Sequence, residues 1–193
     1  MKTIYKIIAV VAILVIVVII IAKVFNIEQI ILQNIYPKKY EEYVEKYAEE
    51  NNIDPLLIFS IIKAESNFKE NAESSSGAVG LMQLMEETAK EIAESMDEPI
   101  LEKEDLKEAE TNIKIGIKYY SILQKNYDGN MLLALTAYNA GIGNVNTWIK
   151  NGIIKSDGSD IENIPYKETN MYVRKIIRNY KMYNKIYTKN DSY

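Results

Sequence analysis

Apolar residues dominate the start of the chain, where an unbroken run extends from Ile7 to Ala22 between flanking lysines. Continued through Phe25, this run corresponds to a helix of about 29 Å, which matches the hydrocarbon core of a bilayer. A cleaved signal peptide is the competing interpretation, but the small residues of a cleavage site are missing after the run. The pattern therefore favours an uncleaved signal anchor over residues 1–25, with the basic N-terminus in the cytoplasm.

Beyond this run, apolar residues recur at helical spacing. Ile58, Ile61 and Ile62 fall at the i, i+3 and i+4 positions of one helix face. Residues 131–140 are almost wholly apolar, which predicts a helix at the centre of the domain. We find no stretch with the alternating pattern of a half-buried strand. Together these patterns predict an all-α fold.

The same patterns divide the chain into segments. The signal anchor is followed by a predicted juxtamembrane linker, residues 26–38. A helical domain is predicted over residues 39–188, and a short tail follows at residues 189–193. A domain of this length can bury one hydrophobic core. We therefore expect one compact helical domain behind a single N-terminal transmembrane helix.

One predicted helix has a carboxyl group on its apolar face. Asp54 is suited to cap this helix and Pro55 to occupy its first position, and Glu65 continues the isoleucine stripe into the last turn. Burial and the negative end of the helix dipole both disfavour the charged carboxylate, so both raise its pKa. A glutamate that holds a proton near neutral pH can act as a general acid. The alternative is a helix that frays early and leaves Glu65 in water.

Charge and composition exclude several functional classes. The first 25 residues contain three of the 23 basic side chains and none of the 27 acidic ones, so the predicted domain is acidic and a poor candidate for binding nucleic acid. The chain has no cysteine and no histidine, which removes thiolate chemistry, histidine triads and the usual zinc ligands. We expect no metal and no cofactor. The stretch 167–189 is locally basic, which indicates a solvated helix face or, alternatively, contact with anionic wall polymer or lipid headgroups.

A loop of small residues, Ser74–Gly80, follows Glu65 and can bring hydroxyls and backbone close to a ligand. Four blocks of sequence resemble the ES, GAxGLMQ, AYNAG and IPxxETxxYV motifs of the lytic transglycosylases of the soluble type (SLT). The blocks are Glu65-Ser66, Gly77–Met85, Ala137–Gly141 and Ile164–Val173. They occur in the family's order over nearly all of the predicted domain. The chain departs from the family at Glu86, where many members have proline.

The resemblance implies a fold, a substrate and a reaction. The fold would be a compact lysozyme-like domain of the goose type. The domain would cleave the MurNAc-β-1,4-GlcNAc bond of peptidoglycan glycan strands and leave a 1,6-anhydro-MurNAc end, with Glu65 as the catalytic acid and then base. The match also places six residues at the substrate: Ser74, Gln83 and Asn139 as hydrogen-bonding groups, Met85 as an apolar wall, Tyr138 to orient Glu65 or the sugar ring, and Glu168 to fix the groove.

Two other functions remain open at this point. Ordinary glycosidases use two carboxyl groups, and the sequence leaves open whether Glu73 or Glu168 approaches Glu65 in space. A second carboxylate would fit a lysozyme-type muramidase that uses water, whereas a lytic transglycosylase uses the C6 hydroxyl of its own substrate. The third possibility is a non-enzymatic module that only binds peptidoglycan. In each case we expect an extracytoplasmic domain held at the cell membrane by the N-terminal helix, or a secreted form if that helix is cleaved.

Overall fold

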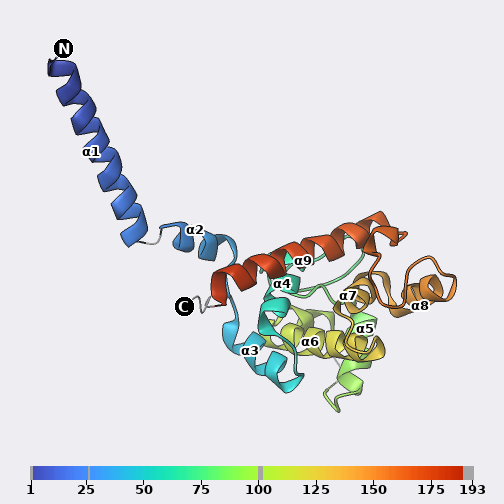
Figure 1. Ribbon diagram of the computed structural model, residues 1–193. Helices are drawn as coiled ribbons and strands as arrows, with labels where there is room; N and C mark the ends of the chain where they lie inside the picture. Colours follow the sequence, from blue (N-terminus) through green and yellow to red (C-terminus); the bar gives the residue numbers. More distant parts are fainter. Residues whose placement is uncertain (1, 26, 100–101, 189–193) are drawn as a thin grey trace. The chain divides into compact units, whose positions relative to one another are not determined.

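The structure is a computed structural model that describes residues 2–25, 27–99 and 102–188; the predicted tail, residues 189–193, lies outside them. Within these ranges the chain is mostly helical (Figure 1). Its only strand-like pairings there are two isolated antiparallel bridges. The predicted all-α fold is confirmed. The chain divides into two compact units, Met1–Pro37 and Lys38–Tyr193.

The N-terminal unit consists of two helices, α1 (Lys2–Val24) and α2 (Ile27–Ile35). No side chain of α1 is buried. Among the described residues, α1 is the one helix that is long and apolar enough to cross a membrane. This is the helix that the apolar run of the sequence predicts.

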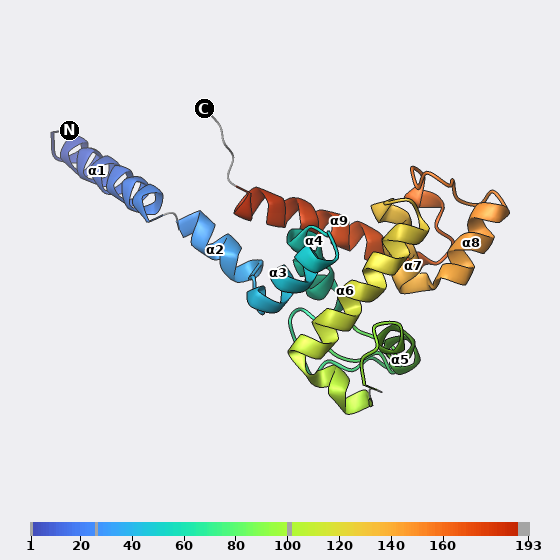
Figure 2. The same cartoon turned by 90° about the horizontal axis from the view of Figure 1, so that it is seen from below.

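The second unit contains seven α-helices and two short 3-10 helices in its described part. They are α3 (Glu41–Glu50), α4 (Pro55–Glu65), α5 (Glu86–Glu94), η1 (Lys103–Lys107), α6 (Ala109–Asn126), α7 (Met131–Ala140), α8 (Ile142–Lys150), η2 (Ile161–Asn163) and α9 (Lys167–Tyr187). Helix α9 packs along α4, and α6 packs against α3, α5 and α7 (Figures 1 and 2).

Helices α4 and α7 form the apolar centre of this unit. Seven of the eleven residues of α4 are buried, and the Asp54 carboxylate accepts a hydrogen bond from the Leu56 N–H at 2.8 Å, which confirms the predicted cap. Residues 133–137 of α7 are buried as well, and Asn130 caps that helix by accepting from the N–H groups of Leu132 and Leu133. Helix α7 therefore lies inside the domain, as its apolar composition predicts.

A long loop joins α4 to α5 and is fastened to α6 by one buried side chain. The Asn112 Oδ1 accepts a hydrogen bond from the Met82 N–H at 2.7 Å, and its Nδ2 donates to the carbonyls of Val79 (3.0 Å) and Leu106 (2.8 Å). Asn112 is completely buried. Because buried backbone groups must be paired, this side chain takes the place of the strand or helix that the loop lacks.

Two glycines allow the loop and α6 to come this close. A Cβ at Gly80 would lie 2.1 Å from the Asn112 Nδ2 and 2.3 Å from the Leu106 carbonyl oxygen, and the φ of Gly80 is +83°. A Cβ at Gly116 would lie 2.5 Å from the Met82 sulfur. Both positions therefore need glycine, Gly80 for its left-handed conformation as well as for space.

We predict that Asn112→Ala lowers the free energy of unfolding by about 2–4 kcal/mol, because the substitution removes three buried hydrogen bonds to the backbone and leaves the Met82 N–H without the oxygen that accepts from it. Asn126→Ala, at an exposed position near the end of the same helix, is the matched control and should change it by less than about 0.5 kcal/mol. Urea denaturation of the full chain in detergent measures both. Equal stability of the two variants would contradict the role given to Asn112.

Candidate active site

Glu65 is the last residue of α4, and its carboxyl group is half-buried. The Tyr172 hydroxyl, from α9, donates a hydrogen bond to the Glu65 Oε1 at 2.7 Å. Burial raises the pKa of Glu65 from its ordinary value of 4.5 to about 7, while the Tyr172 hydrogen bond and the charge of Lys175 act in the opposite direction. The carboxyl group can therefore both give up and accept a proton near neutral pH.

The end of α4 is held on two sides. The Ser66 hydroxyl donates to the Leu81 carbonyl at 2.8 Å, which ties the helix end to the small-residue loop. The Lys175 ammonium group, on α9, donates to the Ala64 carbonyl. A cation at the carbonyl end of a helix is favoured by the helix dipole. These two contacts fix the backbone that carries Glu65.

A cavity of about 530 Å³ opens in front of this carboxyl group. Its walls come from the end of α4, the small-residue loop, the C-terminal end of α7 and the N-terminal end of α9. All seven residues that the sequence placed at the substrate line it: Glu65, Ser74, Gln83, Met85, Tyr138, Asn139 and Glu168. The structure thus brings these residues together, and their individual roles stay predictions.

The two polar loop residues already have structural partners. The Ser74 Oγ accepts from the Ala78 N–H at 3.0 Å. The Gln83 Nε2 donates to the carbonyls of Ala72 (3.1 Å) and Gly80 (2.9 Å), and Gln83 has a left-handed φ of 49°. Its amide nitrogen therefore holds the loop in shape, and the side-chain oxygen is the group it can offer to a ligand.

The helical residues of the cavity are held in a similar way. The Tyr138 hydroxyl donates to the Met82 carbonyl at 2.8 Å, so its hydrogen bond goes to the loop, while Tyr172 bonds Glu65. The Asn139 Oδ1 accepts from the Thr169 hydroxyl at 2.7 Å, which joins α7 to α9 and leaves the amide nitrogen as its donor to a ligand. Burial, with the nearby Glu65 carboxylate, holds the pKa of both tyrosines well above the usual range. Both phenols therefore remain protonated donors.

Two residues of this site had no assigned role in the sequence. Tyr172 stands in the last motif block, four residues after Glu168 and hence on the same side of α9, which was the one signal that it could face Glu65. Asn112 does not line the cavity; it holds the loop that does, by accepting a hydrogen bond from the Met82 N–H. Glu73, considered above as a second carboxylate, pairs with Lys103 and is absent from the lining of the cavity, whereas Glu168 is part of it.

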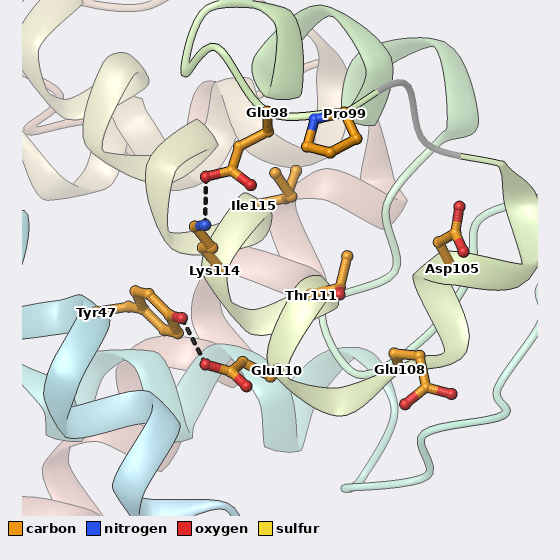
Figure 3. Close-up of a pocket in the computed structure, with 9 residues that line it drawn as sticks. All are labelled: Tyr47, Glu98, Pro99, Asp105, Glu108, Glu110, Thr111, Lys114 and Ile115. Atoms are coloured by element: carbon orange, nitrogen blue, oxygen red, sulfur yellow. Dashed lines mark hydrogen bonds and ion pairs between the residues drawn. The ribbon is translucent and has the colours of Figure 1, made fainter.

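A second hollow, of about 370 Å³, lies between α3, α6 and the segment after α5 (Figure 3). Two pairs of its polar groups bond to each other: the Tyr47 hydroxyl donates to Glu110 at 2.6 Å, and Lys114 pairs with Glu98. Among the described residues, no group of acidic side chains has the arrangement of a metal site. We assign no ligand to this hollow.

We predict that Glu65→Gln is more stable than the wild type above about pH 7. Between about pH 4.5 and 7 the folded protein keeps a proton on Glu65 that the unfolded chain releases. This contribution is complete below pH 4.5 and is lost as the pH rises through about 7, so the wild type should lose up to about 3 kcal/mol relative to the variant. Urea denaturation across this range measures the difference.

The control for this prediction is Glu73→Gln. Lys103 lowers the pKa of the exposed Glu73 carboxyl, so its substitution cannot produce a stability difference of the same sign. A constant difference between Glu65→Gln and the wild type at every pH would show that Glu65 is not held neutral by burial.

Comparison with known proteins agrees with this geometry. The family model described as "Transglycosylase SLT domain" matches residues 42–161. A soluble lytic murein transglycosylase of Salmonella typhimurium is 32% identical over 148 residues, which are 76% of this chain and 23% of the relative. A membrane-bound lytic murein transglycosylase C of Serratia proteamaculans is 36% identical over 118 residues, 55% of this chain and 32% of the relative. The chain thus spans less than a third of the length of these relatives.

Solved structures resemble the domain as well. An inactive Glu→Gln mutant of the lytic transglycosylase Slt from Pseudomonas aeruginosa has a TM-score of 0.73 and 34% identity, over 80% of this chain and 25% of the other. The 70 kDa soluble lytic transglycosylase of Escherichia coli has a TM-score of 0.73 and 29% identity over the same shares. The expected lysozyme-like domain of the SLT type is therefore confirmed. Because the family model covers more than half of its residues, the chain belongs to the transglycosylase SLT domain family.

Proposed function

We propose that this protein is a membrane-anchored lytic transglycosylase that cleaves the MurNAc-β-1,4-GlcNAc bond of peptidoglycan and forms a 1,6-anhydro-MurNAc end. One observation carries the proposal. A glutamate with a pKa of about 7 lies at a cavity that the four motif blocks build together. The relatives named above are lytic transglycosylases, and one of them is membrane-bound by name.

In the first step, protonated Glu65 gives its proton to the glycosidic oxygen. The bond from this oxygen to C1 of the muramic acid breaks, GlcNAc leaves with a free 4-hydroxyl, and positive charge develops at C1. The Glu65 carboxylate then removes the proton of the C6 hydroxyl on the same muramic acid. The C6 oxygen bonds to C1 and closes the anhydro ring, so Glu65 is protonated again and no water is consumed.

The attacking hydroxyl belongs to the sugar that is already bound, so the second step is intramolecular and benefits from proximity. The other residues of the cavity would hold that sugar in place. Ser74 and the amides of Gln83 and Asn139 would bind its polar groups, and Met85 would contact its apolar face. Tyr138, whose hydroxyl bonds to the Met82 carbonyl, would orient the ring rather than Glu65, and Glu168 would fix the groove. The proposed reaction needs no cofactor.

Glu168 also favours one alternative, because it lines the same cavity as Glu65. With Glu168 as the second carboxylate, water could replace the C6 hydroxyl, and the protein would be a hydrolytic lysozyme-type muramidase. The two reactions use the same fold and substrate. Their products differ by one water.

The anchor completes the proposal. Helix α1 carries its lysines at the two ends and exposes apolar side chains along its length. With Lys2 and Lys6 in the cytoplasm, the catalytic domain lies outside the cell membrane, where peptidoglycan is found. The protein's partners would then be glycan strands and the membrane itself.

We predict that Glu65→Gln lowers the rate of peptidoglycan solubilisation by about 10²–10⁴-fold, because glutamine cannot donate the proton. The matched control is Glu73→Gln, which removes a carboxyl group outside the cavity and should keep the wild-type rate. Mass spectrometry of the soluble fragments identifies the reaction. Anhydro ends, lighter by one water than reducing ends, are the expected product.

Other products would decide between the alternatives. Reducing ends that depend on Glu65 would identify the hydrolytic muramidase. Binding to peptidoglycan without release of fragments, in both the wild type and Glu65→Gln, would identify a binding module. Full activity of Glu65→Gln would end the proposal.

We predict that kcat/KM falls above about pH 7, where free Glu65 loses the proton that it must donate. The Tyr172 hydrogen bond lowers this pKa, so Tyr172→Phe should move the falling limb to higher pH. Tyr138→Phe is the control, because its hydroxyl bonds to the Met82 carbonyl. A limb that Tyr138→Phe moves as far as Tyr172→Phe would contradict a specific effect of Tyr172 on Glu65.

A further inference from the structure

Helix α2 has an exposed apolar face that the proposed reaction does not use. None of its nine residues is buried, and its four isoleucines are between 41% and 52% exposed: Ile27, Ile30, Ile31 and Ile35. Their spacing of i, i+3, i+4 and i+8 places all four on one side of the helix. Asn34 falls on the same side, but its side-chain amide donates to the Ile30 carbonyl of its own helix at 2.9 Å. The four isoleucines form the kind of apolar patch that marks a contact with a protein or a membrane.

The other side of α2 is polar and has little charge. Gln29 and Gln33 lie opposite the isoleucines, and Glu28 lies at the edge of the apolar side. The helix contains no lysine and no arginine. It therefore has no cation with which to attract an anionic headgroup or an acidic protein. Whatever covers α2 must be held by the burial of apolar surface.

The position of α2 along the chain indicates what covers it. The 23 residues of α1 correspond to a length of about 35 Å, slightly more than the hydrocarbon core of a bilayer. Lys23, one residue before the end of α1, would extend its ammonium group to the headgroups. Because α2 begins four residues after Lys23, at Ile27, it would start at the membrane surface. Its own length of about 14 Å is too short to cross the bilayer.

We propose that α2 lies along the outer surface of the membrane, with its isoleucines inserted at the boundary between headgroups and acyl chains. This inference rests on the membrane anchoring of the proposed function and is independent of the reaction. Its continuity with α1 favours lipid over a second copy of the chain, because the bilayer lies within a few residues of α2 in every molecule. The predicted juxtamembrane linker is then a helix held at the membrane, rather than a free tether.

The test uses the absence of cysteine from the chain, because a single introduced cysteine then carries the one nitroxide label. The full chain is reconstituted in bilayers of neutral phosphatidylcholine, and the depth of each label follows from its accessibility to oxygen and to a water-soluble nickel chelate. Labels on Ile27→Cys, Ile31→Cys and Ile35→Cys should be buried by about 5–10 Å, all to a similar depth. Labels on Gln29→Cys and Gln33→Cys should remain in water.

Two further variants test whether the apolar face causes this position. Ile30→Gln/Ile31→Gln should bring the label on Ile27→Cys into water, because it removes half of the isoleucines that insert. Gln33→Ser, on the polar side, is the matched control and should leave that label at its depth. A label on Val15→Cys, in the middle of α1, tests the anchor itself and should be inaccessible to the chelate.

Different results would overturn different parts of this assignment. Equal accessibility of both sides of α2 to the chelate, with the Val15→Cys label buried, would refute the inference alone. A depth that declines steadily from Ile27 to Ile35 would show that α2 points away from the membrane. Burial that requires anionic lipid would show that charge, rather than the apolar face, holds the helix.

Two other results separate this inference from its rivals and from the proposed function. Dipolar broadening between labels on different molecules, relieved by unlabelled protein, would assign the apolar face to a second copy of the chain. A Val15→Cys label accessible to the chelate would refute the anchoring and this inference with it. A wild type inactive on peptidoglycan would refute the proposed reaction, while the label depths would still decide the position of α2.

Discussion

The site depends on a single hydrogen bond between two helices, from the Tyr172 hydroxyl to the Glu65 carboxyl group. Burial alone would raise the pKa of the glutamate further, so that it would hold its proton too tightly to donate it readily. The phenol stabilises the charged form and holds the pKa near 7. Because Tyr172 lies on α9 and Glu65 on α4, this balance requires that the two helices pack along each other, as they do over most of their length.

Other contacts of the domain hold the loop between α4 and α5 in a fixed position beside these two helices. Asn112 holds three backbone groups of the segments next to the cavity, and Ser66 joins the end of α4 to the same loop. Gly80 and Gly116 remove the side-chain atoms that would separate the loop from α6. Asn112 and Gly116, four residues apart on α6, therefore act together in this packing. Its effect on Glu65 is indirect, through the position of the loop.

Features set by local chemistry could be read from the sequence, and features set by tertiary contacts could not. The cap at Asp54, the end of α4 at Glu65 and the buried course of α7 follow from capping rules and apolar spacing. Contiguous motif blocks also identified residues that share one cavity. The partners of Tyr172 and Tyr138 depend on how α4, α7, α9 and the loop meet. Apart from the four-residue spacing between Glu168 and Tyr172, the sequence does not indicate which tyrosine reaches Glu65.

The two carboxyl groups that line the cavity differ in their position on a helix: Glu65 is at the C-terminal end of α4, and Glu168 is at the N-terminal end of α9. The two positions favour different charge states. Glu65 is in the last turn of α4, where the dipole and burial disfavour a negative charge. Glu168 is exposed in the first turn of α9, where the dipole favours a negative charge. Only Glu65 is therefore suited to donate a proton. An exposed carboxylate at a helix N-terminus is instead suited to stay charged: in the proposed transglycosylase reaction it would accept hydrogen bonds from sugar hydroxyls, and in the hydrolytic alternative it would act as the base.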